Sequence, residues 1–198
     1  MANDRRQFLL ATAALGVPTL AVFADDKKGD DKNGSEEEVG AAEDLMREHG
    51  VLNRILLIYE EGLRRLRAKE DIPPTVFRES ATLVRKFVED YHEKLEEKFI
   101  FPEFTKHNKL TDLVKVLLKQ HEAGRAVTDV VLRDAADDRF TKEDARHQLV
   151  ESCQAFIRMY RPHEAREDTV LFPAFRPLVG AKEYDELGEK MEAAEHKA

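Results

Sequence analysis

The chain has 198 residues, enough for one compact domain with tails, and carries a formal net charge of −8 at pH 7. A nucleic-acid partner is not expected, because such a protein needs a basic stripe to replace phosphate counterions. The single cysteine, Cys153, excludes an intrachain disulfide and a thiolate metal cluster, so a bound metal must use nitrogen and oxygen ligands. Tryptophan is absent and glycine and proline total only 9 and 7 residues, which favours helices over a turn-rich β architecture.

The first 24 residues have the features of an export signal. Arg5 and Arg6 precede Phe8 and Leu9, and an apolar stretch runs from 11 to 24. This segment resembles a bacterial twin-arginine signal, which implies export of the folded protein to the periplasm or beyond. The apolar stretch is short for a membrane span, and small residues around Ala24 predict cleavage after that residue. An uncleaved N-terminal membrane anchor is the alternative.

The next segment, residues 25–38, reads DDKKGDDKNGSEEE and contains no large apolar residue. We therefore predict a flexible charged linker, because such a segment cannot offset the entropy of ordering.

From residue 39 onward, apolar residues recur every three or four positions, which is the spacing of amphipathic helices. Four long helices are predicted, at residues 39–71, 74–104, 111–134 and 142–175, with a short helix or tail in 179–198. Thr141 and Asp144 have the form of a capping box for the fourth helix. The expected fold is all-α, an antiparallel up-down-up-down four-helix bundle over residues 39–178. A coiled-coil dimer is the alternative, and the wide apolar stripes disfavour it.

An internal repeat relates the two predicted helical hairpins. His49 on the first helix is followed after 43 residues by His92, and His121 on the third helix is followed after 42 residues by His163. Each second histidine is followed four residues later by a glutamate, Glu96 or Glu167. Matching tails then follow, FIFPEF at 99–104 and VLFPAF at 170–175, whose prolines are interpreted as kinks at packed helix ends.

Residues four apart share one face of an α-helix, so His92 with Glu96 and His163 with Glu167 can each address one point. Burying these groups beside apolar neighbours costs several kcal/mol unless a cation or partner compensates them. A single buried histidine is more often structural, but four in repeat register favour a metal site. Imidazole and carboxylate ligands suit iron, manganese or zinc, and bundle cores commonly hold carboxylate-bridged metal pairs.

This ligand set resembles the hemerythrin-like HHE cation-binding family over nearly all of residues 39–175. The resemblance implies two non-haem iron ions with an oxygen bridge and bridging carboxylates, manganese or zinc being less expected. It also implies four nitrogen ligands, His49, His92, His121 and His163, and bridging Glu96 and Glu167. Glu93 is a further candidate ligand, because some family members use the glutamate directly after the second-helix histidine.

Two positions depart from the oxygen-carrying hemerythrins. Those proteins have two histidines four apart on the third helix, whereas His121 has Leu117 and Arg125 at that spacing. Their bridging acid on the fourth helix follows the histidine by five residues, a place held here by Asp168. Glu167 is preferred because it mirrors Glu96, with Asp168 as the alternative. Arg125 is expected either to pair with a buried carboxylate or to reach solvent.

The expected function is a metal-binding protein whose di-iron centre binds or reacts with dioxygen, nitric oxide or peroxide. A di-iron oxidase or peroxidase is a second hypothesis, and a metal-responsive or structural interaction module is a third. The expected partner is therefore a small diatomic molecule or peroxide, and a membrane is involved only if the N-terminal segment stays uncleaved. The oligomeric state is left open.

Overall fold

The computed structural model describes residues 40–195, and every element of regular structure in this range is helical, which confirms the all-α class. The predictions for the export signal and linker lie outside the described residues. The α-helices are α1 (Ala41–Ala68), α2 (Pro74–Leu83), α3 (Glu93–Leu95), α4 (Phe101–Lys106), α5 (Thr111–Asp134), α6 (Asp137–Phe140), α7 (Glu143–Arg166), α8 (Phe172–Val179) and α9 (Ala181–Glu195). The π-helices are η1 (Val84–His92), η2 (Glu96–Ile100) and η3 (Glu167–Leu171).

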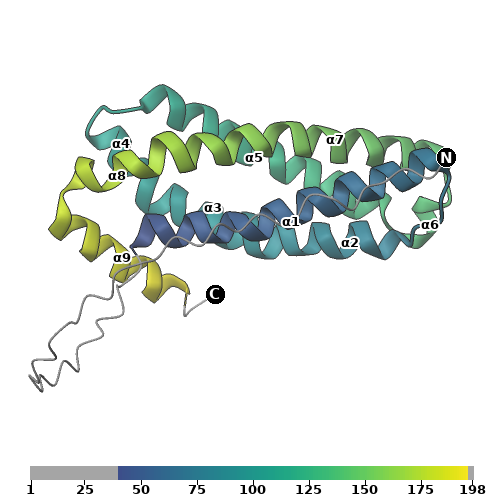
Figure 1. Cartoon of the computed structure of the whole chain (residues 1–198), viewed down its shortest axis with the longest axis horizontal. Coiled ribbons are helices and arrows are strands. Elements are labelled where there is room, and N and C mark those ends of the chain that lie inside the picture. The colour runs from purple at the N-terminus through teal and green to yellow at the C-terminus, as the bar shows by residue number, and fades with distance from the viewer. Residues whose placement is uncertain (1–39, 196–198) are drawn as a thin grey trace, which may run out of the picture. The chain divides into compact units, whose positions relative to one another are not determined.

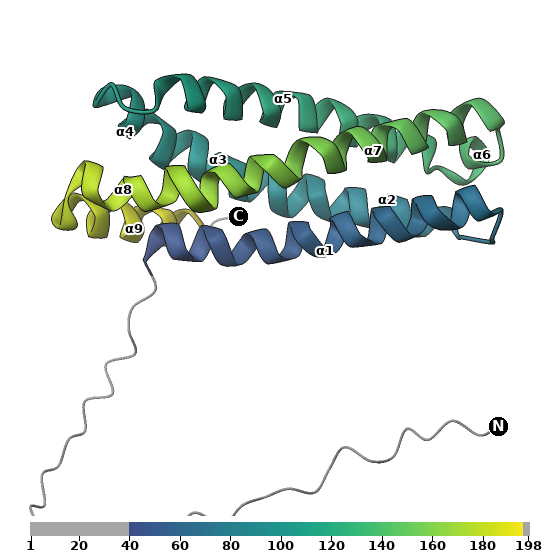
Figure 2. The ribbon, with the colours of Figure 1, turned by 45° about the horizontal axis from the view of Figure 1, so that its top comes forward.

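The long helical segments lie side by side along one axis (Figure 1). The segments from α2 to α4 and from α7 to α8 each form one continuous rod, and α1 and α5 form the other two. Helix α5 packs against α7 and α2, and α1 packs against α7 and α2. Helix α9 folds back against α8 and α1, as Figure 2 shows from a second direction.

Two apolar clusters form the core, and along each rod the predicted histidine ligand lies between residues of one cluster and residues of the other. One cluster lies toward the end of the molecule that contains α6, around Leu56, Phe77 and Phe156. The other lies toward the opposite end, around Leu45, Phe104 and Phe175. The helices thus bury a polar layer at mid-length and close it with apolar side chains on both sides.

The proline-containing tails are built around wide helical turns. In η2 the backbone N–H of Phe101 donates to the carbonyl of Glu96, five residues back, and in η3 Phe172 donates likewise to Glu167. Pro102 and Pro173 follow, and neither can donate a backbone hydrogen bond. Wide π-turns therefore precede the two prolines, and each turn starts at a candidate ligand. Turns of this kind are often found at functional sites.

The boundaries differ from the predictions at the start and the end of the fourth rod. The capping-box prediction is wrong, because no side chain caps α7 and the Thr141 hydroxyl instead donates to the Asp138 carbonyl at 3.0 Å. The short helix α6 occupies the preceding acidic stretch. Helix α8 continues past Phe175 and ends at Val179. Gly180 follows it with a positive φ of 82°, which glycine adopts more readily than other residues.

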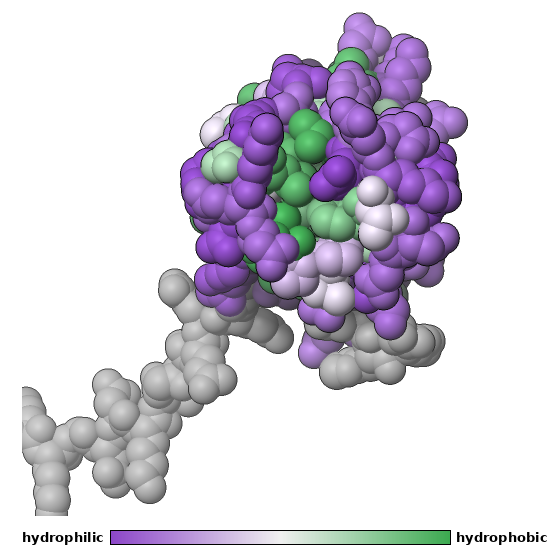
Figure 3. Space-filling view, turned by 90° about the vertical axis from the view of Figure 1, so that its right-hand side faces the viewer, coloured by the Kyte–Doolittle hydropathy of each residue, from purple (hydrophilic) through white to green (hydrophobic). Residues whose placement is uncertain are grey.

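The end of the molecule at which α6 lies is shown in Figure 3, where hydrophobic residues appear within a rim of hydrophilic ones. Phe140 of α6 packs there against Phe77, with ring centroids 6.2 Å apart. Among the helices of residues 40–195, none combines the length and apolar character needed to cross a membrane.

Close packing between α1 and α2 gives a stability prediction. A Cβ atom at Gly62 would lie 2.6 Å from Cζ of the fully buried Phe77, so Gly62→Ala overpacks the core. We expect a loss of about 1–2 kcal/mol in the free energy of unfolding, measured by urea denaturation. Gly188→Ala in α9 is the control, because its Cβ would meet only Ala41 at 3.7 Å, and it should be neutral or stabilising by up to about 1 kcal/mol. Equal stability of Gly62→Ala and the parent protein would contradict the packing.

Candidate metal centre

The structure brings together the six residues predicted from the repeat. They come from all four rods, and each is at most 4% exposed: His49, His92, Glu96, His121, His163 and Glu167. They form two groups that can each hold a metal ion, His49 with His92 and Glu96, and His121 with His163 and Glu167. Within each group the ligand atoms lie within 4.8 Å of one another.

Each of the two glutamates faces an imidazole from both halves of the repeat. In Glu96, Oε1 lies 3.7 Å from Nε2 of His92 and Oε2 lies 3.4 Å from Nε2 of His121. In Glu167, Oε1 lies 3.1 Å from Nε2 of His163 and Oε2 lies 3.5 Å from Nε2 of His49. Both carboxylates therefore span the two groups, as ligands shared by two cations would.

The polar layer lacks the hydrogen bonds that a metal-free core would need. Neither oxygen of Glu96 or Glu167 has a hydrogen-bond partner, although both side chains are fully buried. The Nε2 atoms of His121 and His163 face each other at 3.2 Å. Orphaned buried carboxylates are costly, and cations placed among these atoms would remove the cost. The residues present thus fit a pair of metal ions.

The outer nitrogen of each imidazole is held by a polar side chain of another rod. The Nδ1 contacts are His49 to Asp168 at 2.8 Å, His92 to Glu48 at 2.7 Å, His121 to Glu97 at 3.2 Å and His163 to Gln120 at 3.1 Å. Because the acceptors are carboxylate or amide oxygens, each Nδ1–H donates outward. The lone pair of each Nε2 then points into the layer, as metal ligation requires.

Sequence reasoning missed Glu48, Glu97 and Gln120 and gave Asp168 a different role. Asp168 is 37% exposed at its side chain and holds His49, whereas Glu167 lies inside the layer, so the geometry favours Glu167 as the ligand. The sequence did contain a signal for these outer partners, because each of them is adjacent in sequence to a candidate ligand. Their positions also repeat, 48 with 120 and 97 with 168.

Glu93 lies beside the layer and is 1% exposed, but both of its oxygens already have donors. Oε1 accepts from the Tyr160 hydroxyl at 2.7 Å, and Oε2 accepts from Arg125 at 2.6 Å. Arg125 also donates to the half-buried Glu97 at 2.5 Å. Its pairing with the buried Glu93 is the first of its two predicted alternatives. Glu93 stays a predicted ligand, one that would have to release a donor to bind metal.

Burial and mutual charge set the protonation of the layer. Burial, and then the charge of Glu167, hold the pKa of Glu96 well above its ordinary value. Burial opposes ionisation of Glu167 too, but its contact with His163 lowers its pKa. Burial, and then the neighbouring His49, hold the pKa of His92 well below its ordinary value. Neutral imidazoles with free Nε2 lone pairs are the form that binds metal.

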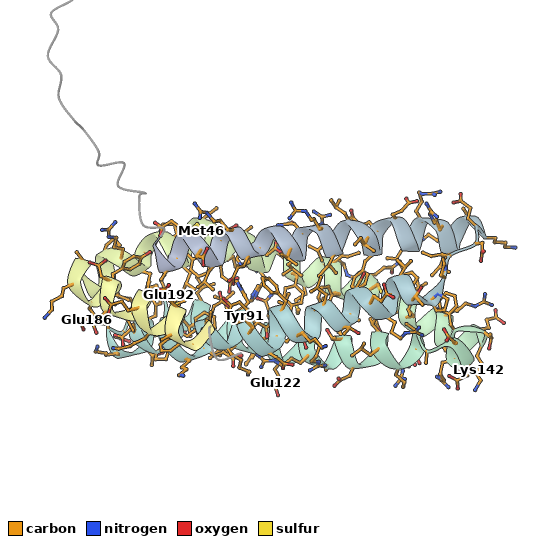
Figure 4. The ribbon with its side chains drawn as sticks, turned by 90° about the horizontal axis from the view of Figure 1, so that it is seen from below. Met46, Tyr91, Glu122, Lys142, Glu186 and Glu192 are labelled. Atoms are coloured by element: carbon orange, nitrogen blue, oxygen red, sulfur yellow. The ribbon has the colours of Figure 1, made fainter. Side chains whose placement is uncertain are left out.

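A cavity of about 380 Å³ opens beside the first group. It is lined mainly by residues of α1, of α9 and of the rod that runs from α2 to α4. Its walls include Glu48, Tyr91 and Glu192. The hydroxyl of Tyr91 donates to Glu48 at 2.9 Å, and Glu48 in turn holds His92. Figure 4 shows Tyr91 on its rod with Glu192 of α9 nearby, while Glu122 of α5 points outward. The cavity therefore reaches the outer partner of a candidate ligand.

Comparisons with known proteins agree with this chemistry. The family model described as the hemerythrin HHE cation binding domain matches residues 40–139, which include His49, His92 and His121. Uncharacterized protein Rv1995 of Mycobacterium tuberculosis and Uncharacterized protein Mb2018 of Mycobacterium bovis are each 45% identical over 203 residues, covering 99% of this chain and 80% of the relative. No solved structure gives a significant match. His163 and Glu167 lie beyond the matched residues, so only the repeat and the geometry support them as candidate ligands.

The metal-free protein should lose stability as the pH rises. Burial raises the pKa of Glu164, which is 5% exposed, from 4.5 to about 7. A raised carboxyl pKa stabilises the fold below pH 4.5, and this contribution disappears as the pH passes 7. We expect Glu164→Gln to be more stable than the parent at pH 8 by about 1–2 kcal/mol, but not at pH 4.5, in urea unfolding with chelator. Glu122→Gln, which changes an exposed acid, should track the parent at both pH values, and a pH-independent effect of Glu164→Gln would contradict this assignment.

Proposed function

This chain belongs to the hemerythrin HHE cation-binding family, and on that basis we propose that it holds two iron ions and binds or reacts with a small oxidant. The nitrogen ligands would be His49, His92, His121 and His163. Glu96 and Glu167 would be carboxylates shared by both ions. The observation that carries the proposal is the pair of fully buried carboxylates without hydrogen-bond donors, each facing both histidine pairs.

Iron fits this donor set better than most divalent ions. Imidazole and carboxylate together suit iron, manganese and zinc, whereas calcium and magnesium prefer oxygen alone. Bound iron would supply reversible redox chemistry toward dioxygen, nitric oxide or peroxide. Four imidazoles and two shared carboxylates leave some of the roughly 12 positions of two six-coordinate ions for a small ligand.

The chain's own residues orient the ligands and exclude water. The outer partners fix each imidazole with Nε2 inward, so little reorganisation is needed when a cation binds. Aromatic rings cover the layer: Phe172 stacks on His49 with centroids 5.8 Å apart, and Phe101 stacks on His121 at 5.5 Å. Arg125 and Tyr160 hold Glu93 beside the second group. A small ligand would enter a preformed, largely dry site.

The finer architecture and location belong to the same proposal. The helical rods and their short connections support an antiparallel up-down-up-down four-helix bundle. The arginine pair at Arg5 and Arg6 supports export of the folded protein through the twin-arginine route to the periplasm or another compartment outside the cytoplasm.

An oxidase or peroxidase is the second candidate. The observation that favours it is Leu117, which is fully buried at the position four residues before His121. A leucine offers no nitrogen ligand, so more positions would stay open for an oxidant than in the oxygen carriers that have a histidine there.

Metal content tests the proposal directly. Purified protein from iron-replete cells should contain about two iron ions per chain, and chelation should lower its melting temperature, because a ligand bound only to the folded state stabilises it. His163→Gln should lose at least one ion. His147→Gln is the matched control on the same helix, since the His147 side chain is 72% exposed, and it should keep both. Fewer than about one ion per chain in the parent protein, with an unchanged melting temperature on chelation, would refute a metal centre.

Reaction with small oxidants separates the two candidates. The reduced, iron-loaded protein is kept under nitrogen until the oxidant is added. Its optical spectrum should change on addition of dioxygen, nitric oxide or peroxide. A stable adduct that reverses on removal of the oxidant supports a binding protein. Repeated turnover of peroxide with a reducing dye supports the enzyme, and the absence of any spectral change would count against both.

A further inference from the structure

The internal repeat makes the two histidine pairs equivalent in position, but their outer partners differ in charge. His92 is held by Glu48, which directly precedes His49, at 2.7 Å. His163 is held by Gln120, which directly precedes His121, at 3.1 Å. His92 and His163 are therefore held from equivalent positions of the repeat. The residue at that position is a carboxylate in the first group and a neutral amide in the second.

The other two outer partners are both carboxylates, but only one of them is neutralised. Glu97 holds His121 and also accepts from Lys94 at 2.7 Å and Arg125 at 2.5 Å. Asp168 holds His49 at 2.8 Å, and among the described residues no lysine or arginine is paired with it. Less of the charge of Glu97 is thus available to polarise its imidazole.

Arg125 adds a further difference between the groups. Its guanidinium contacts Glu93 and Glu97 beside the second group. The repeat-related position near the first group is Asn53, whose neutral amide donates to the backbone carbonyl of His49 at 3.1 Å. A positive charge therefore lies beside the second group and not at the equivalent place in the first.

We propose that the two metal positions are unequal, with the ion at His49 and His92 held more tightly than the ion at His121 and His163. A carboxylate that accepts the Nδ1–H of an imidazole makes Nε2 a stronger donor, and outer partners of this kind change metal affinity by about 10- to 100-fold. The first group has two such carboxylates, and the second has one shared with two cations and one amide. Glu48 and Gln120 are positioning residues that set this difference. The inference rests on the proposed two-metal centre.

Stepwise Zn²⁺ binding tests this without any activity assay. The metal-free full-length protein is titrated with Zn²⁺ at pH 7.5 in competition with a chromophoric chelator. The parent should bind two ions with affinities at least about tenfold apart. Glu48→Gln should weaken the tighter step by about tenfold and leave the weaker step unchanged. Gln120→Glu should strengthen the weaker step by about tenfold and leave the tighter one unchanged.

The two variants act in opposite directions, which damage to the fold cannot produce. Glu122→Gln is the control, because it removes an exposed acid two residues from Gln120 and should alter neither step. Two equal affinities in the parent, or an effect of Gln120→Glu on the tighter step, would overturn the inference while leaving the two-metal centre intact. Failure to bind any Zn²⁺, or iron in the metal analysis above, would overturn the proposed function itself.

Discussion

Burial of Glu96 and Glu167 without hydrogen-bond donors is the constraint on which the molecule depends. Two carboxylates and four imidazoles fill the middle of the helices, where the solvation they lose must be replaced by something else. Cations can do this, and an apolar cluster lies on either side of the layer. The residues of this layer could therefore hold metal ions, and the core on either side of the layer is apolar.

The outer shell of the site explains how such a layer can be assembled reliably. Each imidazole is fixed by a side chain on a different rod, so the rotation of each ring depends on the correct packing of two helices. The same contacts fix the tautomers. The orientation of the ligands therefore depends on the packing of the helices, and the repeat uses the same arrangement twice. The outer partners are two carboxylates in the first group, and one carboxylate and one amide in the second.

Helical periodicity and the repeat predicted the all-α class, the rods and the six residues of the layer, because spacing alone determines which side chains share a helix face. The outer partners were not predicted, since a contact such as Glu48 to His92 depends on ring rotation and on the packing of two rods. Thr141 was misassigned because a capping pattern is local, whereas the short helix α6 sets the backbone there. The fate of Arg125 depended on which carboxylates faced it across the interface. The π-turns were not predicted, because the prolines of the two tails were interpreted as kinks and the five-residue hydrogen bond is a feature of the backbone.

Those π-turns change the angular phase of the helices that contain them. In an ordinary α-helix, residues five apart point about 140° away from each other, since each residue adds about 100°. The five-residue hydrogen bonds from Phe101 to Glu96 and from Phe172 to Glu167 bring each aromatic ring back toward the side of its glutamate. Each ring can then act as a lid over an imidazole of the neighbouring rod. A deletion of one residue in either turn would rotate the lid away and open the site to solvent.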